Sequence, residues 1–187
     1  LVSYHEAGHA LVVAKLPKEY TDPLHKVTIV SRGISGGATW QIPTEDRGIQ
    51  GKKYYLNQLI ILMAGRAAEE IGLDECSTGA QHDFQVATDI ARSMICDWGM
   101  SEELGMVKLG TTQAHSFLGK ESQSNYSEAT AHKIDVQVKK MLDTAYNEAG
   151  EIINSKRHKL ETIVRELIEH ETLTGEEVEQ ILNQKES

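Results

Sequence analysis

The five residues from His5 to His9 carry the clearest chemical signal in this 187-residue sequence. They read His-Glu-Ala-Gly-His, so two histidines stand four positions apart and a glutamate directly follows the first. On a helix, residues i and i+4 lie on one face, about 5–6 Å apart, so both imidazoles can reach one zinc ion. Glu6 is turned about a hundred degrees from His5, which places its carboxylate beside the metal rather than on it.

This arrangement predicts hydrolysis by a zinc-activated water molecule. Zinc lowers the pKa of its bound water to about 7 and polarises a carbonyl group, and Glu6 would take the proton as general base. Chance alone would produce so short a pattern in on the order of a few per cent of shuffled chains. The apolar helical flanks reduce that chance further. Ala7 and Gly8 are small, so another element can approach the helix closely at the site.

A catalytic zinc ion also needs a third protein ligand and an open fourth position. Glu69 and Glu70 interrupt an otherwise apolar helical pattern, where a carboxylate is unfavourable unless it has a specific partner or role. Asp83 lies in the first turn of another predicted helix, on the stripe that includes Ala87. A carboxylate there could instead serve the helix dipole. Spacing alone leaves the choice between Asp83 and the two glutamates open.

The elements that must hold these side chains are mostly helical, because apolar residues recur at helical spacing along most of the chain. Two short β-branched stretches, 25–32 and 38–42, are typical of strands. We expect helices over 1–16, over about 52–71 with Gly72 as a natural stop, from the Ser77–Gly79 cap to Gly99, through Ile134 to Ile153, through Leu160 to Leu167, and after a capping box at Thr174 to Glu177. The predicted fold class is mainly α, with a small β-sheet or hairpin near the N-terminus, and the His-Glu-x-x-His domain is followed by a C-terminal helical bundle.

Composition excludes several classes of protein. A net charge of −9 and a pI of about 5.4 argue against a nucleic-acid surface. The two cysteines, Cys76 and Cys96, have neither the number nor the spacing of a disulfide framework or a cysteine zinc site. The longest apolar run, Leu59 to Ala64, is far shorter than the roughly 20 residues of a membrane helix. Because the sequence begins at Leu1, already inside a helical pattern, we interpret it as a fragment of a longer chain.

Seven blocks of sequence follow one another in a recognisable order over about residues 1–120. They are His5–Ala10, His25–Ile29, Ala64–Glu70, Ser77–Asp83, Ala87–Met94, Trp98–Ser101 and Phe117–Gly119. In this order and spacing they resemble the protease domain of the FtsH family of membrane-anchored AAA-plus metalloproteases. The later helices agree with the family in character only. Two departures are small: Ala64 replaces a common glycine, and His82 stands where the family often has asparagine.

The resemblance implies roles for the acidic residues that spacing left open. It makes Asp83 the third zinc ligand beside His5 and His9. Glu69 then looks like a carboxylate that hydrogen-bonds a ligand imidazole, a partner that ligating histidines usually have.

A further expectation concerns the substrate. Zinc peptidases commonly hold an extended peptide against an exposed strand edge through main-chain hydrogen bonds. The small residues Gly37, Ala38 and Thr39 make the second strand the better candidate.

The resemblance also implies a larger protein around this chain. An ATPase module that uses ATP and Mg²⁺, together with membrane helices, would lie upstream of Leu1, since these residues contain no Walker motif. Six copies, or a hetero-hexamer with paralogues, would degrade unfolded or translocated proteins on the cytoplasmic, organellar matrix or stromal side of the membrane. Residues 1–187 would form one metallopeptidase domain: a catalytic core over 1–104, a flexible Gly-, Ser-, Thr- and Gln-rich loop over 105–125, and C-terminal helices over 126–187.

Two other functions fit parts of the pattern. One is a stand-alone peptidase that acts on short or unfolded peptides without a motor. The other is an oligomeric scaffold with an inactive site. Glu6 argues against the scaffold, because decayed enzymes tend to lose the base first.

Overall fold

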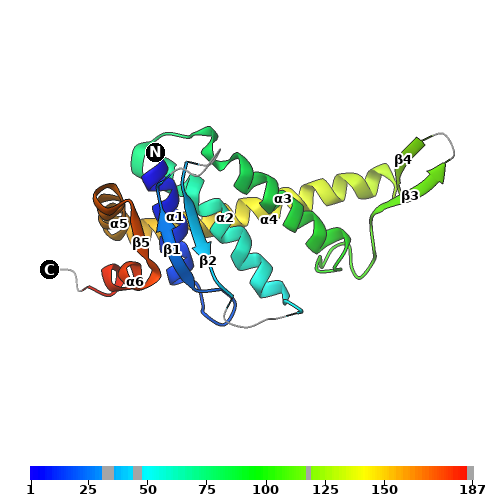
Figure 1. Ribbon diagram of the computed structural model, residues 1–187. Helices are drawn as coiled ribbons and strands as arrows, with labels where there is room; N and C mark the ends of the chain where they lie inside the picture. Colours follow the sequence, from blue (N-terminus) through cyan, green and yellow to red (C-terminus); the bar gives the residue numbers. More distant parts are fainter. Residues whose placement is uncertain (31–35, 44–47, 117–118, 185–187) are drawn as a thin grey trace.

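The computed structural model describes residues 1–30, 36–43, 48–116 and 119–184, and it confirms a mainly α fold with a small sheet (Figure 1). The helices are α1 Val2–Lys15, α2 Lys52–Leu73, the 3₁₀ turn η1 Thr78–Ala80, α3 Gln81–Cys96, α4 Glu128–Ser155, α5 Arg157–His170 and α6 Gly175–Asn183. The strands are β1 Leu24–Thr28, β2 Ala38–Gln41, β3 Thr111–Ser116, β4 Gly119–Ser124 and β5 Thr172–Thr174. None of the described helices is both long and apolar enough to cross a bilayer.

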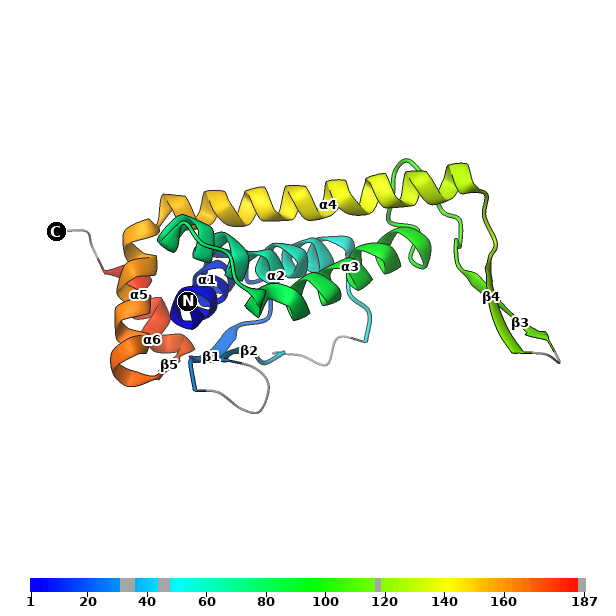
Figure 2. The same cartoon turned by 90° about the horizontal axis from the view of Figure 1, so that it is seen from above.

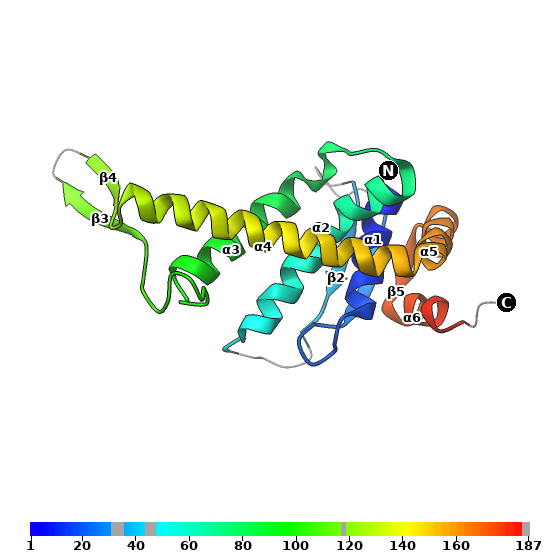
Figure 3. The ribbon, with the colours of Figure 1, turned by 180° about the vertical axis from the view of Figure 1, so that it is seen from behind.

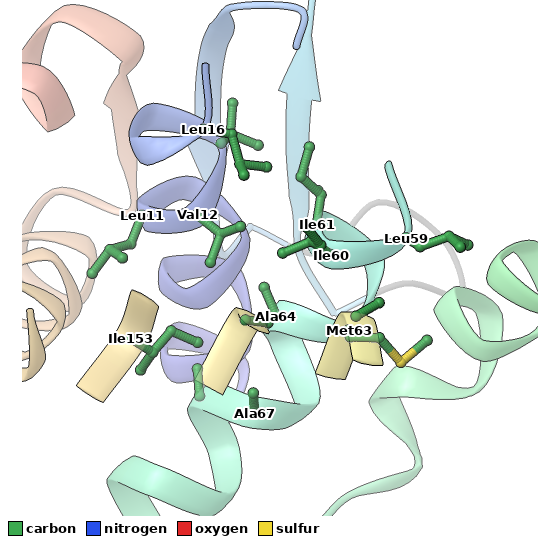
Figure 4. Close-up of a cluster of buried hydrophobic side chains, with 14 of the residues drawn as sticks. Leu11, Val12, Leu16, Leu59, Ile60, Ile61, Met63, Ala64, Ala67 and Ile153 are labelled. Atoms are coloured by element: carbon green, nitrogen blue, oxygen red, sulfur yellow. The ribbon is translucent and has the colours of Figure 1, made fainter. Parts of the chain in front are cut away.

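The elements form three layers (Figure 2). The sheet of β1, β2 and β5 lies on one side, α1, α2 and α3 occupy the middle, and the long helix α4 runs along the opposite side. Seen from behind, α4 crosses the three middle helices, and α5 and α6 lie at its C-terminal end (Figure 3). Buried apolar side chains from all six α-helices of the described residues form one continuous core. Its centre lies where Leu11 and Val12 of α1 meet Ala64 of α2 and Ile153 of α4 (Figure 4).

The small residue Gly8 lets α1 and α2 pack unusually closely, as its type predicted. A Cβ atom at Gly8 would lie 2.5 Å from both the carbonyl oxygen of Ala64 and the Cβ of Ala68. Real Cβ contacts are never that short, so only glycine fits there. This contact sets α2 directly under the histidine-bearing face of α1.

The sheet has the order β2–β1–β5 and is antiparallel throughout. We did not predict β5, because three residues that bury only Leu173 carry no periodic signal. Thr174 ends this strand and also caps α6, and the predicted capping box with Glu177 is confirmed. Strand β1 is shorter than the predicted 25–32, ending at Thr28; positions 31 and 32 lie outside the described residues.

Two expectations, one about a loop and one about the end of a helix, were wrong. The predicted loop over 105–125 contains a hairpin of β3 and β4, which projects beyond the N-terminal end of α4 (Figure 1). Its polar sequence does not alternate between apolar and polar residues, so the pattern did not indicate strands. The flexibility of this segment stays a prediction. Helix α2 does not stop at Gly72 but continues to Leu73, and the residue that caps it, Asp74, adopts a left-handed φ of 51°. Gly72 instead makes room for the ring of Tyr4, whose Cε1 lies 2.2 Å from where a Cβ would stand.

Candidate metal centre

Three side chains from two helices converge at one point. His5 and His9 come from successive turns of α1, and Asp83 comes from the first turn of α3. The Nε2 atoms of the histidines are 3.1 Å apart, and Asp83 Oδ2 lies 3.1 Å from His5 Nε2 and 3.4 Å from His9 Nε2. The structure therefore brings together the histidine pair and one of the three acids that spacing left open.

These separations match what a zinc ion requires. Ligand atoms at 2.0–2.1 Å from a tetrahedral zinc lie about 3.3–3.4 Å from one another. The three observed distances of 3.1, 3.1 and 3.4 Å fall within a few tenths of an ångström of that value. The donor set of two imidazole nitrogens and one carboxylate oxygen is also one that zinc commonly takes.

The hydrogen bonds of the two Nδ1 atoms determine which ring nitrogen of each histidine presents a lone pair to the centre. His9 Nδ1 lies 2.7 Å from the carbonyl oxygen of Ile61, and a carbonyl only accepts, so Nδ1 carries the proton. His5 Nδ1 likewise faces Oε1 of Glu69 at 2.8 Å. In neutral imidazoles both Nε2 atoms are then acceptors pointing at each other and at a carboxylate. A metal ion at their middle would accept all three lone pairs at once.

The same convergence shifts the pKa values of two of these side chains, His5 and Asp83. Burial lowers the pKa of His5, but the hydrogen bond and charge of Asp83, the charge of Glu6 and the hydrogen bond to Glu69 together raise it. Burial raises the pKa of Asp83, yet the hydrogen bonds and charges of the two histidines hold it well below its ordinary value. Asp83 is therefore a carboxylate throughout the physiological pH range.

Glu69 lies behind His5, at the place where a partner for a ligand imidazole was expected. Its side chain is only 1% exposed. It accepts hydrogen bonds from His5 Nδ1 at 2.8 Å and from both the backbone N–H and the hydroxyl of Ser77 at 2.9 Å. Glu70, the other acid of the pair, instead points away and accepts from the Tyr146 hydroxyl.

Gly65 forms the floor of the centre, a role that the sequence analysis missed. A Cβ atom there would lie 2.5 Å from His5 Cε1 and 2.6 Å from both His5 Nδ1 and His9 Nε2. A glycine inside an apolar helix is less favourable than alanine by about 1 kcal/mol, so its presence indicates that another group packs closely against it. This feature of the sequence could have identified Gly65. Helix α2 can lie against both imidazoles because this residue has no side chain.

Glu6 is held from the opposite side by strand β2. Its side chain is nearly buried, and Oε2 accepts a 2.8 Å hydrogen bond from the hydroxyl of Thr39. A Cβ atom at Gly37 would stand 2.8 Å from Glu6 Oε1, so the strand passes directly over the carboxylate. Spacing had suggested Gly37 and Thr39 only as a surface for substrate, and their contacts with Glu6 were not foreseen.

An open cleft of about 980 Å³ runs over the metal centre. One wall is the chain from Gly36 to Gln41, including the predicted residues Gly37, Ala38 and Thr39. In the described part of the sheet β2 is an edge strand, with β1 on its other side. His82 also lines the cleft, but it does not join the converging ligand group. The cleft is therefore lined both by the edge strand β2 and by the three converging side chains.

Comparisons with known proteins agree with this geometry. The sequence model of peptidase family M41 matches residues 1–181. The chain is 44% identical over 186 residues to ATP-dependent zinc metalloprotease FtsH 1 of Sphaerobacter thermophilus, covering 98% of this chain and 28% of that protein. It is 46% identical over 183 residues to the FtsH protein of Chlamydia trachomatis, covering 97% and 20%. For the FtsH protein of Thermotoga maritima the identity is 42% over 188 residues, covering 99% and 30%. The chain thus spans between a fifth and a third of the length of these relatives.

Proposed function

The chain belongs to peptidase family M41, and from that premise we propose that it is a zinc-dependent endopeptidase domain. His5, His9 and Asp83 would hold the metal, and Glu6 would act as general base. The observation that carries the proposal is the convergence of two imidazole lone pairs and a carboxylate oxygen within 3.1–3.4 Å of one another. Bound zinc would supply an activated water and polarise the scissile carbonyl.

The chain's own residues would then handle the proton. Glu6 is not one of the converging ligands, so its carboxylate is free to take a proton at Oε1 while Oε2 accepts from Thr39. The near-complete burial of Glu6 strengthens its interactions there, because the surroundings have a low dielectric constant. Glu69 keeps the proton on His5 Nδ1, and the Ile61 carbonyl does the same for His9.

We propose that substrate binds as an extra strand along β2. Gly37, Ala38 and Thr39 line the cleft, and main-chain hydrogen bonds from an edge strand do not depend on side-chain identity. This mode suits a degradative enzyme that accepts many unfolded sequences.

For the whole protein we propose an ATP-dependent, membrane-anchored protease in which residues 1–187 are the single peptidase domain. Support comes from the relatives, whose names describe ATP-dependent enzymes and whose lengths exceed this chain several-fold. ATP and Mg²⁺ would act in a separate module, and assembly would be hexameric. A stand-alone peptidase is the competing proposal, and a Walker motif with membrane segments in the intact gene would exclude it.

Casein digestion by the intact gene product tests the proposal. With Glu6→Gln we expect cleavage to fall by about 10²–10⁴-fold while zinc content stays at the wild-type value, because general-base catalysis contributes that much. Comparable cleavage by both proteins would reject the mechanism. A wild-type protein that binds zinc but cleaves nothing would favour the inactive scaffold.

Asp83→Ala completes the test of the ligand set. We expect this variant to lose zinc as well as activity, measured by metal analysis after dialysis. Full zinc occupancy without Asp83 would return the choice to Glu69 or Glu70.

A further inference from the structure

One residue in the connection between α2 and α3, Ser77, is linked through its neighbours to His5 on α1 and to Asp83 on α3. The hydroxyl of Ser77 donates to Oε1 of Glu69 at 2.9 Å, and Glu69 in turn accepts from His5. The same hydroxyl oxygen accepts from the backbone N–H of Gly79 at 3.1 Å. It thereby caps η1, the 3₁₀ turn that runs directly into α3 and Asp83.

The two partners of the Ser77 hydroxyl determine in which bond it donates and in which it accepts. A carboxylate accepts and an amide N–H donates, so the single hydroxyl proton goes to Glu69 and a lone pair receives Gly79. A serine that served only as a cap would accept from Gly79 and leave its proton to solvent. Here the hydroxyl donates its proton in a hydrogen bond to Glu69, the buried carboxylate that orients His5.

Two further hydrogen bonds fix the main chain of Ser77. Its N–H donates to Oε2 of Glu69 at 2.9 Å, and its carbonyl accepts from an Arg66 nitrogen at 2.7 Å. Arg66 also packs over the Phe84 ring, which adjoins Asp83, at 5.2 Å. Arg66 Nε lies 3.9 Å from Glu69 Oε2; it is buried and has no hydrogen-bond partner within the described ranges. The guanidinium therefore places its charge beside Glu69 and binds the main chain at Ser77.

From these contacts we propose that Ser77 is a positioning residue for the metal centre. It sets His5 through Glu69 and sets Asp83 through the capped turn, so that ligands from α1 and α3 are aligned before metal arrives. The inference rests on the proposed zinc site, and it adds a residue that lines the cleft but is not one of the converging side chains.

Zinc affinity of the intact protein, measured by competition with a chromogenic chelator, tests this role. We expect Ser77→Ala to raise the zinc dissociation constant by about tenfold or more, within the 10–100-fold typical of lost outer partners. Ser77→Thr keeps the hydroxyl and should stay close to wild type. If Ser77→Ala does not fold, Ser77→Cys, with its weaker S–H donor, takes its place with the same expected direction.

The matched control is Ser127→Ala. Ser127 also caps a helix, since its hydroxyl accepts from Thr130 N–H at the start of α4, beside the hairpin (Figure 1). Its loss should lower thermal stability without changing zinc affinity. A second check is the double variant with Glu69→Gln: adding Ser77→Ala should then weaken zinc binding by a smaller factor than it does alone.

The outcomes separate this inference from the proposed function. Wild-type zinc affinity in Ser77→Ala, with stability lowered as in Ser127→Ala, would overturn the positioning role and leave the zinc site intact. A threonine variant as weak as the alanine variant would also overturn it, because packing rather than the hydroxyl would then decide. If the wild-type protein itself bound no zinc, the proposed function would fail instead.

Discussion

The two sides of the metal centre are built differently. On the side of α2, Glu69 is 1% exposed and accepts three hydrogen bonds, the Ile61 carbonyl holds His9, and Gly65 packs against both imidazoles. On the side of β2, Glu6 depends on one half-buried hydroxyl, that of Thr39, in a strand that borders the cleft. The core thus fixes the proposed ligands, while the proposed base is held by a wall of the cleft.

This difference suggests that metal affinity and turnover depend on separate residues. Changes on the α2 side should alter zinc binding first and activity as a consequence. Changes on the β2 side should alter activity and leave zinc binding as it was. Variants on the two sides can therefore confirm or break the division.

The largest effect is expected from Gly65→Ala. The added methyl group would stand 2.5–2.6 Å from atoms of both imidazoles, so His5 and His9 must move apart from their present geometry. We expect zinc affinity to fall by more than the roughly 10–100-fold caused by losing an outer partner, and activity to fall with it. Gly150→Ala is the control, since that helical glycine has open space around it and the change should stabilise α4 by about 0.5–1 kcal/mol. Normal zinc binding in Gly65→Ala would show that α2 does not constrain the ligands.

An intermediate effect is expected from Glu69→Gln. One carboxylate oxygen becomes an NH₂ group that must face a donor, either His5 Nδ1–H or the Ser77 N–H. We expect zinc affinity to fall by about 10–100-fold in chelator competition. Its neighbour supplies the control: Glu70→Gln alters a side chain that is 43% exposed and bonds Tyr146, so zinc affinity should not change. Equal effects of the two substitutions would contradict the assignment of Glu69.

The smallest effect is expected on the β2 side, from Thr39→Val. The variant keeps the shape but removes the hydrogen bond to Glu6 Oε2. Because the Thr39 hydroxyl is only half-buried, we take the lower end of the range for hydrogen bonds to charged groups, about 1.5 kcal/mol, so kcat should fall about tenfold, with KM little changed. Zinc affinity should stay within about twofold of wild type, and Thr39→Ser should restore kcat. A drop in zinc affinity would erase the distinction between the two sides.

The sequence alone predicted the parts of the centre that depend on local spacing. His5, Glu6 and His9 share one helix, so a 3.6-residue period was enough to relate them. Asp83 lies on another helix, and spacing could not choose it over Glu69 without the family resemblance. The roles of Gly65, Thr39 and Ser77 are contacts between elements, which no local pattern encodes. Strand β5 was not predicted for a related reason, since three residues are too few to show a periodic pattern.

The third strand of the sheet has a consequence for how the protein is made. β5 pairs with β1, and Thr28 donates to the carbonyl of Glu171, a contact that spans 143 residues. Helices α5 and α6 then cover α1, the helix that carries both histidines. Contacts so distant in sequence form late, because the loop between them must close first. We therefore expect a nascent chain to complete this centre only after β5 and the helices that pack on α1 have emerged, well after the histidine pair itself has been made.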